Sequence, residues 1–387
     1  MNILFFPAWY DSEELPGAGS FFVEQAKALT TAGHKVTVVL ADILYYPYKA
    51  KTKRFCILEQ NRDGIEVYRI KVPSYCTGQI PFLFFKYYQF FYKKLMHLLE
   101  KRGYKFDVIY AHSFWHAGYI ATRYKKKYNI PLIVQEHRSL VMTGELKKSA
   151  NKYLKQTVLQ ADAFFCVSKK LKESVIEKTN VKNKIDILPN MVDDIFTFKE
   201  LPKKSEFIFA FIGTLDDNKR SYFLLKTFEK FLKTNDNTRL VIAGKGPLKD
   251  TIINYISNSE ILKSHVDFLG FISRTQVVDL LTRSNAFILP STYETFGVVY
   301  IEAMAIGRPV IATRNGGAND IVNETNGFLI DIDNEQQLID AMDRMVKEYD
   351  KFNLKQISKD CIEKYSKDAI IGKVIRTMNE CINKNEK

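Results

Sequence analysis

The sequence predicts an α/β protein made of two doubly wound domains, each built on a parallel sheet. Three observations support this prediction. The chain has 387 residues, which is too long for one ordinary hydrophobic core. Strand-like and helical segments alternate through the first half, and the alternation starts again near Phe207.

The first half contains short apolar strands separated by segments of helical spacing. Residues 2–6 form an apolar strand, 21–32 have helical periodicity, and 35–40 are rich in β-branched residues. Further buried strands are expected at 108–111, 132–135 and 163–167. Apolar strands in series with helices imply a parallel sheet that is covered on both faces.

The second half repeats this pattern after a polar stretch at 190–205 that Pro189 and Pro202 flank. A helix is expected at 222–233, and an amphipathic helix at 361–382 ends the series. Strands are expected at 207–212, 240–243, 266–269, 286–289, 309–312 and 327–330.

Composition bears on the compartment and on partners. No apolar run approaches the ~18 residues of a membrane-spanning helix, and the first residues lack the pattern of a secretory signal. The cysteines are scattered, which predicts reduced thiols in a cytoplasmic protein. The net charge is +13, of which residues 1–195 contribute +12, so we expect an anionic partner for the first half.

The segment 81–105 holds nine aromatic residues, six cations and one acid. This mixture suits an interfacial helix on an anionic membrane, and it also resembles a nucleic-acid surface. A core helix with lysines on its outer side is an equally good interpretation of the pattern.

The most informative stretch is 291–317, STYETFGVVYIEAMAIGRPVIATRNGG. Phe296 and Gly297 open a helix that starts at the carboxyl end of an apolar strand, where open α/β sheets bind ligands. The free N–H groups around Gly297 and Val298, together with the helix dipole, make an anion site suited to diphosphate.

Glu294 and Glu302 lie eight residues apart in this stretch. Glu294 is in the loop, within reach of sugar hydroxyls, and Glu302 lies further along the helix, where it is able to accept hydrogen bonds from ribose. A single glutamate is more often a solvated surface residue. Glu302, however, sits in the apolar run VVYIEAMAI, where a carboxylate needs a partner.

The E-x7-E pair with the following EAMAIGRPVIATRNGG resembles the donor-site signature of a large retaining GT-B glycosyltransferase family. That family contains sucrose synthases, glycogen-synthase-like enzymes and bacterial polysaccharide and lipopolysaccharide transferases. The resemblance covers nearly the whole chain, including 16–40, the segment ILPNMVDDIF at 187–196, and the loops at 211–219 and 243–248. It implies two Rossmann-like domains that face each other across a cleft.

The resemblance also implies roles for individual residues. Glu294 would contact the transferred sugar, Glu302 the ribose, and Lys219 would neutralise the diphosphate. The loop Gly270, Phe271 and Ile272 would bracket the base. His137 matches the family's active-site histidine, although a lone histidine near a strand end is more often structural. His112 and His116 follow another strand and are expected to line the same cleft.

Two loops depart from the family pattern. The family has Gly-Arg and then Lys-Gly in the first donor loop, whereas this chain has Gly213-Thr214 and then Lys219-Arg220. Arg220 is the candidate for the second positive charge. In the opening loop, the usual glycine pair is split into Gly17 and Gly19, which would approach donor and acceptor.

The sequence predicts no required metal and no cofactor. Asp331 and Asp333 have the D-x-D spacing of metal-dependent transferases of a different fold. They lie between a strand and a helix, however, so Asp333 or Asn334 is expected to cap that helix. Lysine and a helix N-terminus would supply the positive charge instead.

These observations favour a retaining, metal-independent glycosyltransferase that uses a nucleotide-sugar donor, with UDP-sugars preferred. Residues 1–195 would bind the acceptor, 196–365 the donor, and 366–387 would form a helix that packs back on the N-terminal domain. The expected acceptor is a saccharide or lipid-linked saccharide of cell-surface polysaccharide or lipopolysaccharide synthesis. We expect peripheral contact with the inner face of the plasma membrane and no nucleic acid.

Two other functions remain open from the sequence. A sugar-nucleotide epimerase or hydrolase of the same fold would turn over without an acceptor. A non-catalytic polyanion or membrane binder would use the basic first half, but it would have no use for the glutamate pair.

Overall fold

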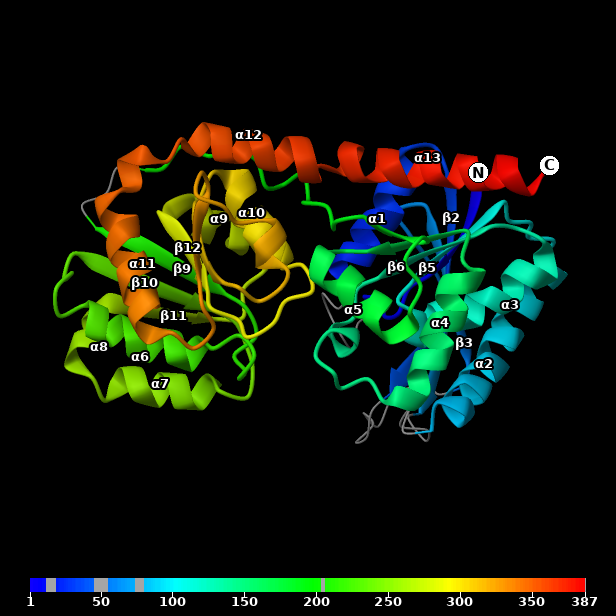
Figure 1. Cartoon of the computed structure of the whole chain (residues 1–387), viewed down its shortest axis with the longest axis horizontal. Helices are drawn as coiled ribbons and strands as arrows, with labels where there is room; N and C mark the ends of the chain where they lie inside the picture. Colours follow the sequence, from blue (N-terminus) through cyan, green and yellow to red (C-terminus); the bar gives the residue numbers. More distant parts are fainter. Residues whose placement is uncertain (12–18, 45–54, 74–79, 203–205, 387) are drawn as a thin grey trace. The chain divides into compact units, whose positions relative to one another are not determined.

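A computed structural model describes the chain except residues 12–18, 45–54, 74–79, 203–205 and 387 and the side chains of Ile43, Leu44 and His116. The described chain forms two compact units (Figure 1). Unit 1 comprises Met1–Pro189 and Ile370–Lys387, and unit 2 comprises Asn190–Ala369. The chain therefore passes between the units at 189/190 and again at 369/370, beside the boundaries at 195/196 and 365/366 that the sequence predicts.

Unit 1 contains an eight-stranded sheet of order β3-β4-β2-β1-β5-β6-β7-β8. Its strands are β1 Asn2–Phe6, β2 Lys35–Leu44, β3 Ile57–Arg62, β4 Ile65–Pro73, β5 Val108–His112, β6 Leu132–Glu136, β7 Ala163–Cys166 and β8 Ile185–Ile187. All neighbours pair in parallel except β3 and β4. The sheet is therefore parallel as the sequence predicts, except that β3 adds an antiparallel strand at this edge. Asp63 and Gly64 both have positive φ there, 52° and 77°, which is typical of a two-residue hairpin turn.

The helices of unit 1 are α1 Ser20–Thr31, α2 Pro81–Lys101, α3 Tyr119–Tyr128, α4 Asn151–Gln160, α5 Lys169–Thr179 and most of α13 Lys367–Asn385. The single tail helix that the sequence predicts is in fact two helices, because α12 Leu354–Tyr365 ends before α13 begins. Ser366 separates them with an extended backbone, ψ 160°, and its hydroxyl accepts the Ala369 N–H. The break coincides with the passage of the chain between the units.

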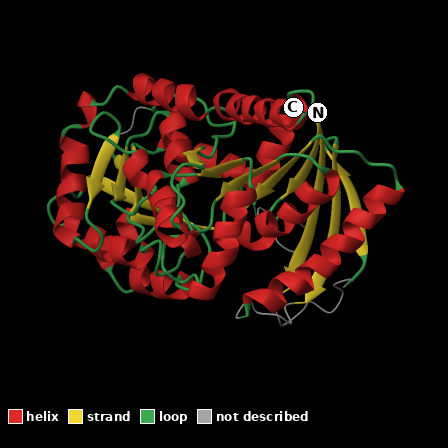
Figure 2. Cartoon of the chain, turned by 45° about the vertical axis from the view of Figure 1, so that its right-hand side comes forward, coloured by secondary structure: helices red, strands yellow, loops and turns green. Residues whose placement is uncertain are grey.

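Unit 2 contains a six-stranded, wholly parallel sheet of order β11-β10-β9-β12-β13-β14. Its strands are β9 Phe207–Ile212, β10 Thr238–Ala243, β11 Val266–Gly270, β12 Ala286–Leu289, β13 Val310–Thr313 and β14 Gly327–Ile330. Its helices are α6 Ser221–Phe231, α7 Lys249–Ser257, α8 Glu260–His265, α9 Arg274–Arg283, α10 Val298–Ile306, α11 Glu335–Lys347 and α12. Helices lie on both faces of each sheet (Figure 2).

The strand order reverses once in each sheet, between β1 and β5 in unit 1 and between β9 and β12 in unit 2. Loops that leave the carboxyl ends of two such strands diverge to opposite faces, and the crevice between them is the usual ligand site of open α/β sheets. The sheet topology therefore marks one candidate site in each unit. Among the described helices, none combines the length and apolar character required to cross a membrane.

Candidate active site

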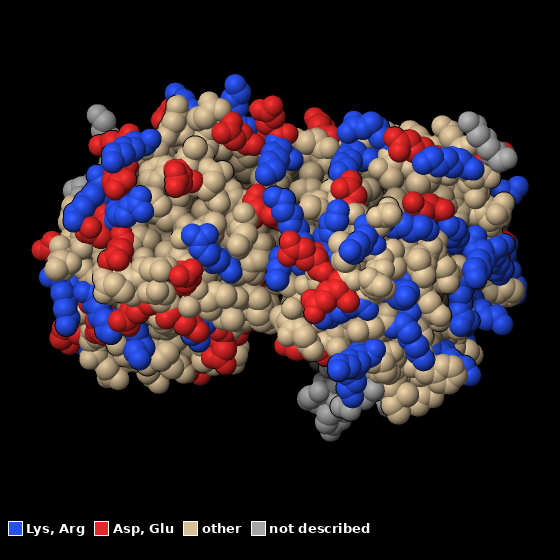
Figure 3. Space-filling model, viewed as in Figure 1, with Lys and Arg blue, Asp and Glu red and all other residues tan. Residues whose placement is uncertain are grey.

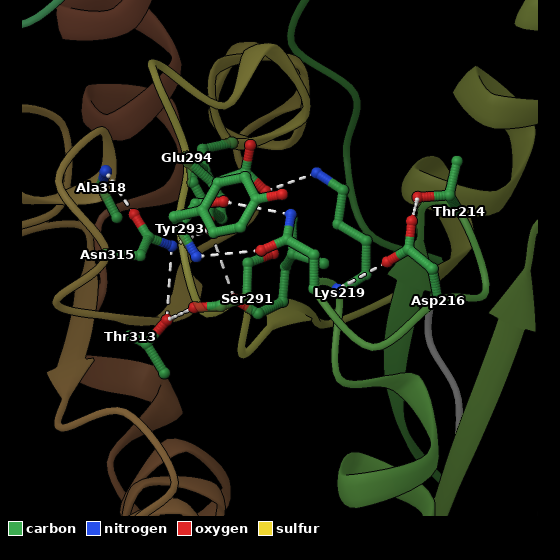
Figure 4. A network of polar contacts seen from close by, with 12 residues as sticks. Thr214, Asp216, Lys219, Ser291, Tyr293, Glu294, Thr313, Asn315 and Ala318 are labelled. Carbon is green, nitrogen blue, oxygen red and sulfur yellow. Dashed lines mark hydrogen bonds and ion pairs between the residues drawn. The ribbon is translucent and has the colours of Figure 1, made fainter. Parts of the chain in front are cut away.

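In unit 2, the loops after β9 and β12 meet at the point where the strand order reverses. Asn218 joins them: its carbonyl accepts the Thr292 N–H at 2.8 Å. Its side-chain amide bonds both the N–H and the carbonyl of Tyr293, at 3.1 and 3.2 Å. These three hydrogen bonds of Asn218 fix the β9–α6 loop against the loop that carries Glu294. Figure 4 shows Lys219 and Asp216 on one side of this junction and Tyr293 and Glu294 on the other.

Lys219 and Glu294 form an ion pair across this junction. The distance from Lys219 Nζ to Glu294 Oε1 is 2.5 Å, although the residues are 75 positions apart. Glu294 is held on its other side, where its N–H donates to Asn315 and its carbonyl accepts from Gly317. The side chains of Lys219 and Glu294 are 21% and 11% exposed. Two of the residues that the sequence singles out are therefore in contact in a largely dehydrated site.

The N-terminus of α10 begins just after Glu294. Gly297 has φ 89°, and a β-carbon there would lie 2.4 Å from the Tyr300 ring, so only glycine makes this turn without strain. Phe296 is buried beside it. The first N–H groups of a helix, here those of Val298 and its neighbours, have no partner within the helix and carry the positive end of its dipole. An anion that contacts them would lie near the Lys219–Glu294 pair.

Glu302 lies one turn further along α10 and is 5% exposed. The Arg274 guanidinium donates to its carboxylate, with Nη1 to Oε1 at 2.5 Å. Burial raises the pKa of Glu302, while the neighbouring charge of Arg274 opposes that rise. The partner that a carboxylate in this apolar run requires is thus Arg274, which the sequence analysis missed because it is on another helix.

The β9–α6 loop differs from the arrangement that the sequence suggests. Thr214 Oγ1 donates to Asp216 at 2.7 Å, and the second oxygen of Asp216 accepts the Lys219 N–H at 2.8 Å. Arg220 is paired with Asp333, and its guanidinium lies 5.5 Å from the Phe223 ring. The structure therefore brings Lys219 to Glu294 but engages Arg220 in a different ion pair.

Gly213 begins that loop, and its N–H donates to the Ala243 carbonyl. A β-carbon at Gly213 would make only ordinary contacts, the nearest at 3.6 Å to Phe211. The described residues around Gly213 therefore leave room for a side chain. The position leaves the backbone unobstructed at the carboxyl end of β9.

The loop after β11 presents an aromatic ring to solvent. Phe271 is 63% exposed, and Lys245 Nζ lies 4.5 Å from the centre of its ring. Gly270 has φ 66°, which turns the chain at the end of the strand, and Ile272 is half-buried. An exposed phenyl ring at the carboxyl edge of a sheet suits stacking against a nucleobase.

The D-x-D segment forms the start of α11. The Asn334 side chain accepts the Gln337 N–H at 3.0 Å, so Asn334 is the helix cap among the two candidates from the sequence. Asp331 accepts the Gln337 side chain, and Asp333 pairs with Arg220. Within the described ranges, no three His, Cys, Asp or Glu side chains gather in a way that would hold a metal ion.

In unit 1, two of the predicted histidines meet at the carboxyl ends of β5 and β6. His112 Nδ1 lies 3.1 Å from His137 Nε2, and the Phe22 ring packs on both imidazoles at 4.8 and 5.1 Å. Both histidines are buried. Burial, and then the neighbouring His137, hold the pKa of His112 well below its usual value, so His112 is neutral.

Glu136 organises the two loops that carry these histidines. Its carboxylate accepts the N–H groups of Phe114 at 2.7 Å, His137 at 3.0 Å and Arg138 at 2.9 Å. It is fully buried, which raises its pKa. The sequence analysis missed Glu136, although an acid that ends the apolar strand LIVQE was a readable signal.

The opening glycine loop is only partly described. Gly17 lies outside the described residues, and so does the side chain of His116. Gly19 has φ 70° and precedes α1, and a β-carbon there would lie 2.8 Å from the Trp9 ring. Gly19 is therefore required by the backbone and by Trp9, irrespective of any ligand.

Comparisons with known proteins agree with this geometry. Residues 16–195 match the family described as Glycosyltransferase Family 4, and residues 192–366 match Glycosyl transferases group 1. An uncharacterized glycosyltransferase of Methanocaldococcus jannaschii is 25% identical over 90% of each chain. The alpha-monoglucosyldiacylglycerol synthase of Streptococcus pneumoniae is 27% identical over 66% of this chain and 62% of its own.

A solved structure of Anabaena HepE in complex with UDP has a TM-score of 0.71 at 17% identity and covers 98% of this chain and 100% of its own. The fold is GT-B, with two Rossmann-like units. The two family models together span residues 16–366 and both describe glycosyltransferases, so the protein is a glycosyltransferase.

Proposed function

We propose that this glycosyltransferase moves a sugar from a nucleotide diphosphate, preferably UDP, to an acceptor hydroxyl with retention at the anomeric carbon. The observation that carries the proposal is the Lys219–Glu294 pair at the β9/β12 crevice, beside the N-terminus of α10. A diphosphate needs positive charge and free N–H donors as the leaving group develops, and both are available there. Glu294 would then face the hydroxyls of the transferred sugar.

The nucleoside would extend from this crevice along two neighbouring features. Glu302 is placed to accept hydrogen bonds from ribose, and the exposed Phe271 ring to contact the base. The relative of this fold that was solved with UDP supports a uridine donor. No metal is assigned a role in the proposal, because Lys219 and the α10 N-terminus supply the positive charge.

We assign the acceptor to unit 1, with His137 as the candidate ligand contact and His112 beside it at 3.1 Å. No protein nucleophile is assigned. One relative is named for a glycolipid product, which supports a lipid-linked acceptor. The proposed location is the cytoplasm, at the inner face of the plasma membrane. The reaction would belong to the synthesis of cell-surface polysaccharide or lipopolysaccharide.

The surface of unit 1 supports membrane contact through one side of α2. Most aromatic side chains of this helix are buried, so the core-helix interpretation holds for that side. Phe82 and Phe90 are 52% and 55% exposed, with Lys86 and Lys94 over their rings at 4.4 and 4.7 Å. Lys and Arg side chains also gather over unit 1 on the face shown in Figure 3. Exposed aromatics among cations suit the interface of an anionic bilayer.

The first test is a thermal-shift screen against UDP, GDP, ADP and CDP, each with and without EDTA. A ligand that binds the folded state raises the unfolding midpoint by mass action. One nucleotide is expected to stabilise the protein with or without EDTA, and Glu302→Ala is expected to reduce the shift. Glu260→Ala is the matched control, because that carboxylate is 90% exposed in the same unit.

The second test is turnover of the corresponding nucleotide sugar, with the anomeric configuration of the product read by NMR. A product with retained configuration and a requirement for acceptor support the proposal. Inverted configuration, an absolute requirement for metal, or nucleotide binding that Glu302→Ala leaves undiminished would refute it.

A further inference from the structure

The N-terminus of α9 carries an arginine in a position that helix electrostatics disfavour. Arg274 is the first residue of the helix, where the dipole favours acids over cations. The helix has its own cap, because Ser273 and Gln276 form a reciprocal capping box. Arg274 is therefore not needed to begin the helix, and its charge must be stabilised by its neighbours.

Two carboxylates from different parts of unit 2 stabilise that charge. Nη1 of Arg274 donates to Glu302 at 2.5 Å, and Nη2 lies 3.6 Å from Asp193. The guanidinium also lies 4.8 Å from the ring of Phe196, which is fully buried. A planar guanidinium suits such a bridge, because its two terminal nitrogens reach different carboxylates at once. A lysine ammonium does not reproduce this geometry.

The second carboxylate is itself fixed. Asp193 and Asp194 both pair with Lys367, at 3.5 and 3.0 Å. The neighbouring Val192 N–H donates to the Tyr365 carbonyl at 2.8 Å. These residues lie close to the two points where the chain enters and leaves unit 2. The segment that holds Arg274 is thus anchored by ion pairs and backbone contacts.

We propose that Arg274 is a positioning residue for ribose recognition, which sets the orientation and charge of the Glu302 carboxylate from its anchor at Asp193. The inference rests on the proposed function, because it assumes that Glu302 receives the ribose hydroxyls. Glu302 is 5% exposed, so without a cation its charged form would be poorly stabilised. Arg274 stabilises the charged carboxylate and bonds one of its oxygens, Oε1, and the other oxygen remains for a ligand.

The test compares a nucleoside diphosphate with its 2′,3′-dideoxy form. The nucleotide used is whichever of UDP, GDP, ADP and CDP stabilises the wild-type protein most. Titration calorimetry gives the ratio of the two dissociation constants, which reports only the contribution of the ribose hydroxyls. In the wild-type protein this ratio is expected to be about tenfold or more, since a hydrogen bond to a charged group contributes about 1.5–3 kcal/mol.

Arg274→Ala is expected to reduce this ratio to below about threefold, with little change in affinity for the dideoxy form. Arg274→Lys should recover part of the ratio, because it restores the positive charge but not the second nitrogen that faces Asp193. Arg283→Ala, at the other end of α9, removes the same charge from an exposed site and should leave the ratio unchanged.

The proposal is overturned if Arg274→Ala lowers the affinity for both nucleotides by the same factor, which is the result expected of a merely structural role. It is also overturned if the ratio stays at the wild-type value. Glu302→Ala separates this failure from that of the proposed function. If Glu302→Ala abolishes the ratio while Arg274→Ala keeps it, the donor site stands and only the role of Arg274 is wrong. If neither changes it, the ribose assignment itself fails.

Discussion

Replacing Lys219 by methionine separates the chemistry of the Lys219–Glu294 pair from its contribution to stability. The change keeps the aliphatic length and removes the cation that lies 2.5 Å from Glu294. Removing one partner of a fully buried ion pair costs about 3–5 kcal/mol, whereas an exposed pair contributes about 0–1 kcal/mol. With exposures of 21% and 11%, this pair lies between those limits. We expect a loss of about 2 kcal/mol in the free energy of unfolding of unit 2.

For a unit of this size, 1 kcal/mol shifts the unfolding midpoint by about 2–4 °C, so differential scanning calorimetry resolves the effect. Glu294→Gln leaves the ammonium without its partner and should also destabilise. The double variant removes both charges, so it should be more stable than the sum of the single changes predicts. A double variant that simply adds the two losses would show that the pair is not energetically coupled.

Activity should follow a different pattern. If Lys219 stabilises the leaving diphosphate, Lys219→Met should lower kcat, measured as nucleotide released per unit time, by about 10²–10³-fold. The double variant should be more stable than the two single losses predict, but its kcat should stay low. Lys226→Met, which removes an exposed cation from the following helix, is the control. Wild-type kcat in Lys219→Met would refute the leaving-group role, whatever the calorimetry shows.

Three further changes test separate parts of the site. Phe271→Ala should weaken nucleoside diphosphate binding by about 1–3 kcal/mol, the usual contribution of base–aromatic stacking, and should leave inorganic pyrophosphate binding unchanged in calorimetry. Because burial raises the pKa of Glu302, its carboxylate protonates at a higher pH than an ordinary glutamate. Nucleotide affinity should therefore fall as the pH is lowered, starting above the ordinary glutamate range, and Glu302→Gln should remove that fall from the titration curve. Serine at both Phe82 and Phe90 should reduce co-sedimentation with anionic vesicles severalfold without changing turnover of a water-soluble acceptor. Unchanged sedimentation would remove α2 as the membrane contact.

Much of the fold was readable because local signals and tertiary structure agree. β9, β12 and β14 begin and end where the sequence predicts, since each is a short apolar run bounded by turn or loop residues. The β3–β4 hairpin was missed although Asp63-Gly64 is a strong turn signal, because the segment lay between the strands of the expected parallel series. The break at Ser366 was not readable, since no proline or glycine marks it and the helical period continues across it.

The site was predictable where a motif names the residue and unpredictable where a distant partner fixes it. Glu294 and Glu302 are visible in one stretch of sequence. Their partners are 75 and 28 positions away, on elements that only the folded sheet brings close. Asn218 shows the same limit: an ordinary loop residue by sequence, it ties two loops together through three hydrogen bonds. Such roles depend on the crossover order of the strands, which no local pattern encodes.

The departure from the family pattern in the first donor loop has a consistent physical interpretation. The Thr214 hydroxyl and the Lys219 N–H both donate to Asp216, so this carboxylate fixes the loop at the position where the resemblance would place an arginine. Arg220 does not restore the missing charge near Glu294, because it pairs with Asp333. Under the proposed function, the charge that faces the diphosphate therefore comes from Lys219 and the α10 N-terminus. A helix N-terminus cannot be removed by one side-chain substitution. Of these two sources of positive charge, only Lys219 can therefore be lost by a single substitution.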